Sequence, residues 1–113
     1  NLISAVSNAR AKISGLTKID GDNLAANSFE LYQNYPNPFN PVTTIKYSLQ
    51  YESNVSLKVY DIMGRLIKEL INEKQSAGVK EVIFDASDLA SGIYLYELKA
   101  GSYSSIRKMT LIK

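Results

Sequence analysis

The strongest indication of the fold comes from one stretch of the sequence, Asp88-Leu89-Ala90-Ser91-Gly92-Ile93-Tyr94. It has the form of a tyrosine corner, in which a tyrosine at the start of a strand donates a hydrogen bond to the backbone just upstream. Tyr94 would supply the hydroxyl, and Gly92 ends the loop that crosses between the sheets. Because this corner is a feature of two-sheet domains, the stretch favours a β-sandwich over a small closed barrel, which has the same local signals.

Short strands surround this corner from residue 29 onward. Their side chains alternate between polar and apolar, and turn residues separate them. Gly64 is the expected positive-φ residue of one hairpin turn. The predicted strands are Phe29–Gln33, Val42–Leu49, Val55–Ile62, Arg65–Ile71, Val79–Phe84, Ile93–Lys99 and Tyr103–Ile112. About seven such strands predict an all-β, Ig-like antiparallel sandwich, although the cysteines and tryptophan of antibody domains are absent.

The alternation also predicts which side chains face the core. One face of the second predicted strand and one face of the third are apolar. Their expected inward residues are Thr43, Ile45, Tyr47 and Leu49, followed by Val55, Leu57 and Val59. The sixth predicted strand is apolar on both faces, which is typical of a central strand.

A second unusual stretch, Tyr35-Pro36-Asn37-Pro38-Phe39-Asn40-Pro41, holds all three prolines of the chain. Each proline restricts its own φ and favours extended geometry in the residue before it. The asparagine side chains can accept hydrogen bonds from nearby backbone N–H groups, so the turn can satisfy its own polar groups. Phe39 is the one large apolar side chain available to pin this segment to a core. The stretch therefore predicts a rigid connection between strands.

Composition narrows the chemistry that the chain can perform. Its 113 residues suffice for one domain, and it contains neither cysteine nor histidine. Thiol nucleophiles, disulfides, the usual zinc ligands and the commonest general base are therefore missing. No phosphate-binding loop or nucleophile elbow is present, and the carboxylates are scattered over polar faces and loops. We expect no enzymatic activity, no cofactor and no metal.

Charge and hydropathy exclude two further classes of partner. The net charge is +2 and the 13 basic residues are spread along the chain, so no stripe for nucleic-acid phosphates is expected. No apolar run is long enough for a transmembrane helix.

The tyrosines leave one alternative open, a carbohydrate-binding or structural Ig-like module of a cell-surface enzyme. The candidates for stacking on a sugar are Tyr32, Tyr47, Tyr51, Tyr60 and Tyr103, which should then form a coplanar line on one face.

Residues 1–28 differ in composition from residues 29–113. Apolar residues recur at helical spacing from Leu2 to Ile13, where a short helix is expected. The run Asp20-Gly21-Asp22-Asn23 offers oxygen ligands but lacks the glutamate and spacing of an EF-hand, so we expect a solvated turn. We interpret 1–28 as a linker or the tail of a preceding domain, and the chain as the C-terminal piece of a longer protein.

Five blocks of this sequence resemble a known family. They are Leu31–Pro41, Thr43–Leu49, Val59–Arg65, Leu89–Tyr94 and Lys108–Lys113. In this order they closely resemble the type A C-terminal sorting domain of the type IX (Por) secretion system, found in Bacteroidetes and related phyla. The resemblance covers about Phe29 to Lys113.

The resemblance implies a signal domain rather than an enzyme. Members are Ig-like sandwiches placed last in secreted enzymes and adhesins. After export to the periplasm, such a domain is recognised by the outer-membrane translocon and a shuttle protein. A sortase-like peptidase then removes it, here by a cut within Gly21–Ser28, and the cargo is secreted or held at the cell surface. No nucleic acid and no small-molecule substrate is implied.

The last predicted strand is the candidate contact for the receptor. Its basic residues and its expected uncapped edge suit pairing with a partner strand. The expected contact residues are Arg107, Lys108, Met109, Leu111 and Lys113. The alternative is that Met109, Leu111 and Ile112 only close the sandwich. The segment Pro36-Asn37-Pro38-Phe39-Asn40-Pro41, together with Gly64, Gly92 and Tyr94, is assigned to structure.

Overall fold

A computed structural model describes residues 28–113 of the chain. The helix expected from Leu2 to Ile13 and the turn expected at Asp20–Asn23 lie outside the described residues. Within residues 28–113, no helix is long and apolar enough to cross a membrane.

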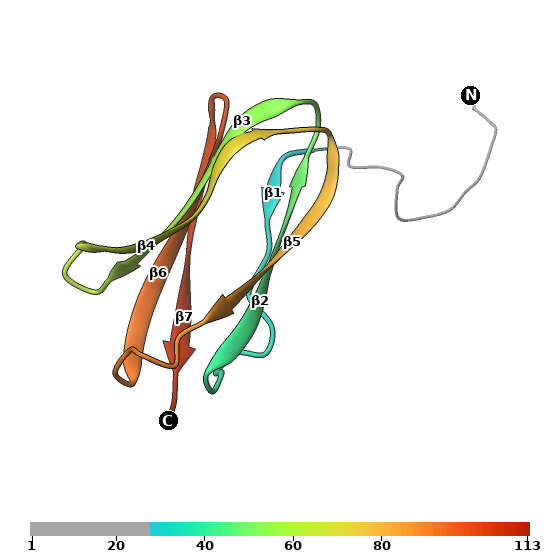
Figure 1. Cartoon of the computed structure of the whole chain (residues 1–113). Coiled ribbons are helices and arrows are strands. Elements are labelled where there is room, and N and C mark those ends of the chain that lie inside the picture. Colours follow the sequence, from blue (N-terminus) through green and yellow to red (C-terminus); the bar gives the residue numbers. More distant parts are fainter. Residues whose placement is uncertain (1–27) are drawn as a thin grey trace.

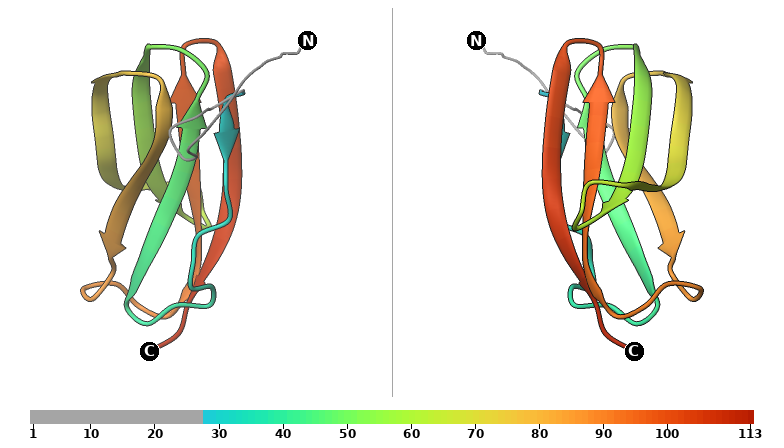
Figure 2. Two further views of the ribbon diagram at one scale, coloured as in Figure 1. Left: turned by 90° about the vertical axis from the view of Figure 1, so that its right-hand side faces the viewer. Right: turned by 90° about the vertical axis from the view of Figure 1, so that its left-hand side faces the viewer.

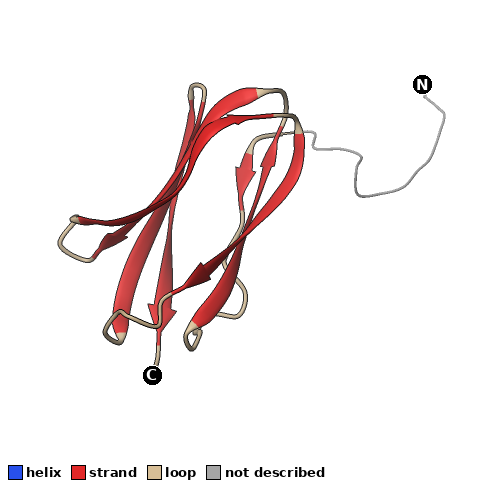
Figure 3. Ribbon diagram, viewed as in Figure 1, coloured by secondary structure: helices blue, strands red, loops and turns tan. Residues whose placement is uncertain are grey.

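Seven strands form two antiparallel sheets, which confirms the predicted sandwich (Figures 1 and 3). The strands are β1 Glu30–Leu31, β2 Val42–Leu49, β3 Ser53–Asp61, β4 Leu66–Gln75, β5 Gly78–Asp85, β6 Gly92–Ala100 and β7 Tyr103–Leu111. The first sheet has the order β1-β2-β5 and the second has the order β4-β3-β6-β7. Figure 2 shows β1 and β7 at one side of the sandwich and β4 and β5 at the opposite side.

The core lies between the two sheets and follows the predicted alternation. All of the expected inward residues of β2 and β3 are buried. The buried apolar core consists of Leu31, Phe39, Ile45, Tyr47, Leu49, Val55, Leu57, Val59, Phe84, Ala86, Tyr94, Tyr96, Leu98, Ala100, Met109 and Leu111. Strand β6 is central, between β3 and β7, as expected. Its outer face meets solvent nonetheless, since Ile93 is 38% exposed and an antiparallel sheet needs only one covered face.

The lengths of β1 and β4 differ most from those expected. Strand β1 is short because the chain leaves regular pairing after Leu31, although Tyr35 still bridges to Thr44 on β2. Strands β4 and β5 run on almost to their shared turn, where a polar loop was expected from residue 72. Gln75 still pairs with Ser53 on β3. Backbone pairing continues there because polar side chains on solvated faces do not interrupt a ladder.

The predicted tyrosine corner and the predicted positive-φ glycine turn are both present. The Tyr94 hydroxyl donates to the Ala90 carbonyl at 2.7 Å, which is the predicted tyrosine corner. Gly92 opens β6 directly before it. Gly64 has φ +85° in the turn between β3 and β4, and its N–H donates to the Asp61 carbonyl at 2.9 Å. The same turn is fastened by an ion pair between Asp61 and Arg65 at 2.7 Å. Backbone N–H donation to Asp61 and the Arg65 guanidinium lower the pKa of its carboxyl group.

Candidate recognition surface at the last strand

The segment of residues 33–41, here called the Pro–Asn loop, runs along the outer edge of β7. The N–H of Phe39 donates to the Thr110 carbonyl at 2.9 Å, and the N–H of Ile112 donates to the Phe39 carbonyl at 2.9 Å. The side chain of Asn37 accepts a hydrogen bond from the N–H of Thr110 at 3.0 Å. The loop therefore extends the second sheet beyond its last strand.

Two longer side chains continue this contact toward the middle of β7. Gln33 Nε2 donates to the Lys108 carbonyl at 2.7 Å. Arg107 Nε donates to the Leu31 carbonyl at 2.7 Å. The expectation of an uncapped last strand is therefore wrong between Lys108 and Ile112, because the Pro–Asn loop supplies partners for the edge.

The same loop is also fixed to the first sheet. Tyr35 and Thr44 exchange two backbone hydrogen bonds of 3.0 and 2.9 Å. Asn34 Nδ2 donates to Thr43 Oγ1 at 3.0 Å and to the Pro36 carbonyl at 3.1 Å. Thr43 Oγ1 in turn donates to that carbonyl at 2.8 Å. Because Asn34 and Thr43 are buried, these bonds satisfy polar groups that would otherwise be costly.

Phe39 anchors the loop, as predicted. Its side chain is 2% exposed, and its ring centre lies 6.2 Å from that of Phe84 on β5. Asn37 acts differently from the prediction, since it bonds the distant Thr110, whereas Asn34 bonds the nearby Pro36 carbonyl. All three X–Pro bonds of the loop are cis. The loop is hydrogen-bonded to both sheets and so joins them.

A buried tyrosine that the sequence reasoning missed holds the start of this loop. The Tyr96 hydroxyl accepts from the N–H of Asn34 at 2.8 Å and donates to the Tyr32 carbonyl at 2.7 Å. Burial raises the pKa of Tyr96 to about 12. The sequence feature that could have indicated this role is a tyrosine on the inward face of a central strand. A buried phenol needs a hydrogen-bond partner, so such a residue is expected to bond a distant segment.

The five candidate contact residues fall into two groups. Met109 and Leu111 are 0% and 1% exposed, so they close the core, as the alternative expectation held. Arg107, Lys108 and Lys113 are exposed. Lys113 is tied back to the loop before β6 through its N–H to Ser91 Oγ at 3.0 Å and its Nζ to the Ser87 carbonyl at 2.6 Å. The structure thus offers a basic rim, not a free edge, along the end of β7.

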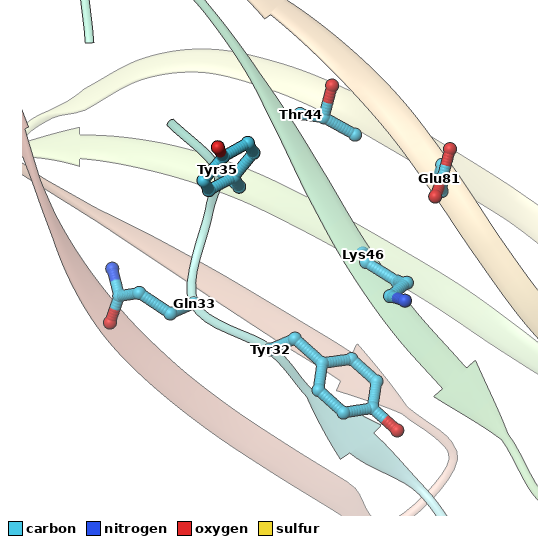
Figure 4. A pocket seen from close by; sticks show the side chains of 6 residues that line it. All are labelled: Tyr32, Gln33, Tyr35, Thr44, Lys46 and Glu81. Carbon is cyan, nitrogen blue, oxygen red and sulfur yellow. The ribbon is translucent and has the colours of Figure 1, made fainter. Parts of the chain in front are cut away.

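A separate hollow of about 390 Å³ lies on the outer face of the first sheet (Figure 4). Its lining residues are Tyr32, Gln33, Tyr35, Thr44, Lys46 and Glu81. Lys46 Nζ lies 5.5 Å from the centre of the Tyr32 ring, in cation–π range. The hollow holds a single carboxylate, Glu81, so it lacks the facing pair of acids that glycoside hydrolysis requires.

The five tyrosines considered for sugar stacking do not share a face. Tyr47 is buried. Tyr51 and Tyr103 both pack on Phe29, in edge-on and stacked geometry respectively. Tyr60 lies on β3 in the second sheet. Of the five candidate tyrosines, only Tyr32 lines the hollow. The coplanar line expected of a carbohydrate-binding module is not found among the described residues.

The fold is similar to domains of two solved proteins from Porphyromonas gingivalis. PorZ is described as an essential bacterial surface component of the type IX secretion system. It matches 74% of this chain at 26% identity, with a TM-score of 0.52. Latent PorU, solved as a dimer, matches 88% of the chain at 19% identity, with a TM-score of 0.59, and shows the fold alone. This chain covers only 11% and 10% of the lengths of those two proteins.

The sequence itself identifies the family. Among curated proteins no match was found. The profile described as "Secretion system C-terminal sorting domain" matches residues 33–113, from the start of the Pro–Asn loop through β7. That span includes the loop, the tyrosine corner and the basic rim. The chain therefore belongs to the family of secretion system C-terminal sorting domains.

Proposed function

We propose that this domain directs a cargo protein across the outer membrane through the type IX secretion system. In this proposal the translocon and a shuttle protein read the folded domain, and the cargo reaches the cell surface or the medium. The observation that carries the proposal is the hydrogen-bonded unit formed by the Pro–Asn loop and the end of β7. This unit joins residues more than 70 positions apart, such as Asn37 and Thr110, so it exists only in the folded domain. A receptor that serves many unrelated cargoes requires a feature that exists only in the folded sorting domain.

The basic rim of this unit is the proposed receptor contact. Arg107, Lys108 and Lys113 place three cations along the end of one strand, all of them solvent-exposed. Exposed charges of one sign steer association with a surface of the opposite sign and suppress wrong partners. We therefore propose an acidic surface on the receptor. Met109 and Leu111 support the rim from the core rather than contacting the receptor.

The domain acts in this proposal as a signal and as a substrate, not as an enzyme. A sortase-like peptidase would cut between Gly21 and Ser28, before the sandwich begins. Support comes from contacts at the start of the described residues, which are the hydrogen bond from Ser48 to the Ser28 carbonyl at 2.8 Å and the packing of Phe29. These contacts favour a domain of residues 29–113, preceded by the segment 1–28.

The test is an export assay with a fluorescent reporter. The reporter carries a periplasmic signal peptide and is followed by the full 113-residue chain, in a host with a working type IX system. We expect the reporter at the cell surface or in the medium, with the domain removed. A fusion without the chain should stay in the periplasm. Periplasmic retention of the full fusion, with its sandwich folded, would overturn the proposal and favour a structural Ig-like module.

The receptor contact is tested by reversing charge. Lys108→Glu combined with Lys113→Glu should reduce export severalfold while the domain stays folded, as measured by chemical denaturation. The matched control is Lys74→Glu with Lys99→Glu, which removes two cations that are also exposed, from β4 and β6. Equal export of the two double variants would exclude the basic rim as the contact.

A further inference from the structure

The two sheets have four edge strands, and three of them are protected against pairing over part or all of their length. The edges are β1 and β5 in the first sheet and β4 and β7 in the second. Strand β1 has only two residues. Strand β7 is covered by the Pro–Asn loop from Lys108 to Ile112. Short strands and covered edges are two of the means by which proteins prevent unwanted strand addition.

Strand β4 is protected by irregular pairing. Its register with β3 shifts twice, between Leu57 and Lys58 and again between Val59 and Tyr60. Such bulges twist an edge away from regular pairing. Lys68 lies opposite the inward-facing Val59, so a charged side chain occupies an inward position at this edge. An added strand would have to bury that charge, which is costly.

Strand β5 has no comparable protection over most of its length. Its eight residues pair with β2 without a register shift. Val79 and Ile83 are 44% and 71% exposed, although both are apolar. Lys80 does point toward the core side, but its ammonium is bonded to Ser76 at 3.1 Å, at the hairpin end. The stretch from Glu81 to Asp85 is left regular and open.

The backbone of β5 presents bonding groups to this open side. On β2, Thr44 bonds Tyr35 on the β1 side, so the neighbouring Ile45 bonds its partner Val82 on β5. Alternate residues of β5 therefore turn their N–H and C=O groups away from β2. By this alternation, Val79, Glu81 and Ile83 offer free donors and acceptors beside exposed apolar side chains. Figure 2 shows this edge at the side of the sandwich opposite to the Pro–Asn loop.

We propose that β5 is a docking edge to which an extended, basic segment of a partner protein adds as a further strand. The inference rests on the sorting function proposed above, with the receptor complex as the partner. Strand addition draws its affinity from main-chain hydrogen bonds, with side-chain positions giving specificity. It is distinct from the contact of Arg107 and Lys108 at the basic rim, because these two residues lie on β7, at the other side of the sandwich.

The charges on β5 specify the chemistry of the partner. Glu81 is exposed, and the only ion pair within residues 28–113 is Asp61–Arg65. Lys46 lies opposite Glu81 on β2, but its ammonium is placed over the Tyr32 ring. A partner strand with lysine or arginine opposite Glu81 and an apolar residue opposite Ile83 fits this edge.

A second copy of this chain fits the edge less well in the antiparallel register that sets Ile83 against its own copy. In that register Glu81 of one chain lies opposite Asp85 of the other. Directly opposed like charges are destabilising in a sheet. The acidic edge therefore favours a different, basic strand as its occupant.

The direct test uses the full chain and synthetic peptides of the length of β5. In the first peptide every second residue is valine, and the positions between hold lysine or threonine. The second peptide is the same except that glutamate replaces each lysine. We expect the basic peptide to slow amide hydrogen exchange at Val79, Glu81 and Ile83, and the acidic peptide to bind about five- to tenfold more weakly. Protection at the β7 edge instead of β5, or equal binding of both peptides, would overturn the proposal. A concentration-dependent dimer that protects the same amides without peptide would also overturn it in favour of a second copy.

A proline variant separates the edge from the fold. Ile83→Pro removes one N–H that points away from β2, so the ladder within the sheet is kept and the added strand loses a donor. The matched control is Ile106→Pro on β7, where Ile106 is 57% exposed. Ile106 lies two residues before Lys108 and four before Thr110, whose carbonyls face the Pro–Asn loop, so its N–H also turns outward. We expect Ile83→Pro to abolish peptide protection and Ile106→Pro to retain it.

The export assay distinguishes this inference from the sorting function itself. If the unaltered chain exports its reporter and a folded Ile83→Pro variant does not, β5 is needed for receptor binding. If both export the reporter equally, the docking edge is wrong and the sorting function stands. If the unaltered chain fails to export while the basic peptide still protects β5, the sorting function fails and the edge serves another partner.

Discussion

The hydroxyl of Tyr96 receives a hydrogen bond of 2.8 Å from the backbone N–H of Asn34, a residue 62 positions earlier in the chain. Tyr96 lies on the central strand β6 of the second sheet, whereas the Asn34 side chain bonds Thr43 in the first sheet. The pair therefore links the two sheets through a buried polar contact at the start of the Pro–Asn loop. The same loop continues from this contact to cover β7, where Asn37 reaches Thr110.

Removing the Tyr96 hydroxyl should destabilise the domain. In Tyr96→Phe the N–H of Asn34 and the carbonyl of Tyr32 lose their partner in a buried setting. We expect the free energy of unfolding to fall by about 1–3 kcal/mol, measured by urea denaturation. The control is Tyr60→Phe, whose partly exposed hydroxyl bonds Glu97 at 3.2 Å. An effect of Tyr96→Phe no larger than that of the control would contradict the assigned role.

The same residue should make stability depend on pH in the alkaline range. The pKa of Tyr96 is about 12 in the folded chain and about 10 when unfolded. The folded state thus holds this proton more tightly, and the resulting stability is present in full below about pH 10. It should be lost as the pH rises from about 10 to about 12. Tyr47, whose pKa burial also raises, should add to this loss.

Denaturation midpoints measured across that range provide the check. Tyr96→Phe should reduce the dependence on pH, because a phenylalanine has no proton to lose. The tyrosinate absorbance of the folded chain, measured against pH, should show at least one tyrosine that ionises at a higher pH than a solvent-exposed tyrosine. A decline of stability that is identical in Tyr96→Phe and the unaltered chain would assign it to other groups.

The strands and the core were predictable because they depend on local alternation. Val55, Leu57 and Val59 read as inward from the sequence, and all are buried. The tyrosine corner was predictable for the same reason, since Tyr94 and Ala90 are four residues apart. The covered edge of β7 was not predictable, because Asn37 and Thr110 are 73 residues apart. Nothing in the local pattern of residues 108–112 distinguishes a free edge from one that a distant loop occupies.

The bulges of β4 escaped prediction for a related reason. The run from Leu66 to Ile71 contains apolar and charged residues without a clean alternation. Only the pairing with β3 decides that Leu66, Lys68, Glu69 and Ile71 have partners while the residues between them do not. The consequence concerns function, because these bulges interrupt the β4 edge, whereas β5 stays regular and open along its length and β7 is covered from Lys108 to Ile112.

The tyrosine corner should contribute to stability but not to recognition. In Tyr94→Phe the ring remains in the core and the hydrogen bond to Ala90 is lost. Net hydrogen bonds of this type contribute about 0.5–1.5 kcal/mol, and we expect a loss of that size in urea denaturation. Export of the reporter should be unchanged at growth temperatures below the melting point. A folded Tyr94→Phe variant that fails to export would show that the loop before β6 takes part in recognition.

Phe39 tests whether the Pro–Asn loop covers the edge of β7. Phe39→Ala removes a large side chain that is 2% exposed and packs near Phe84. We expect a loss of about 3–5 kcal/mol in the free energy of unfolding. Because the Phe39 backbone holds Thr110 and Ile112, amide exchange at Ile112 should accelerate by more than exchange at the central strand β6.

The matched control is Tyr35→Ala in the same loop. Tyr35 is 81% exposed, so its removal should change stability by no more than about 0.5 kcal/mol. Its backbone bonds to Thr44 should persist, and Ile112 should keep its protection. If Phe39→Ala destabilises the whole domain uniformly, without selective exchange at Ile112, then Phe39 acts only as a core residue. In that case the cover over β7 would depend on Asn37 and Gln33 instead.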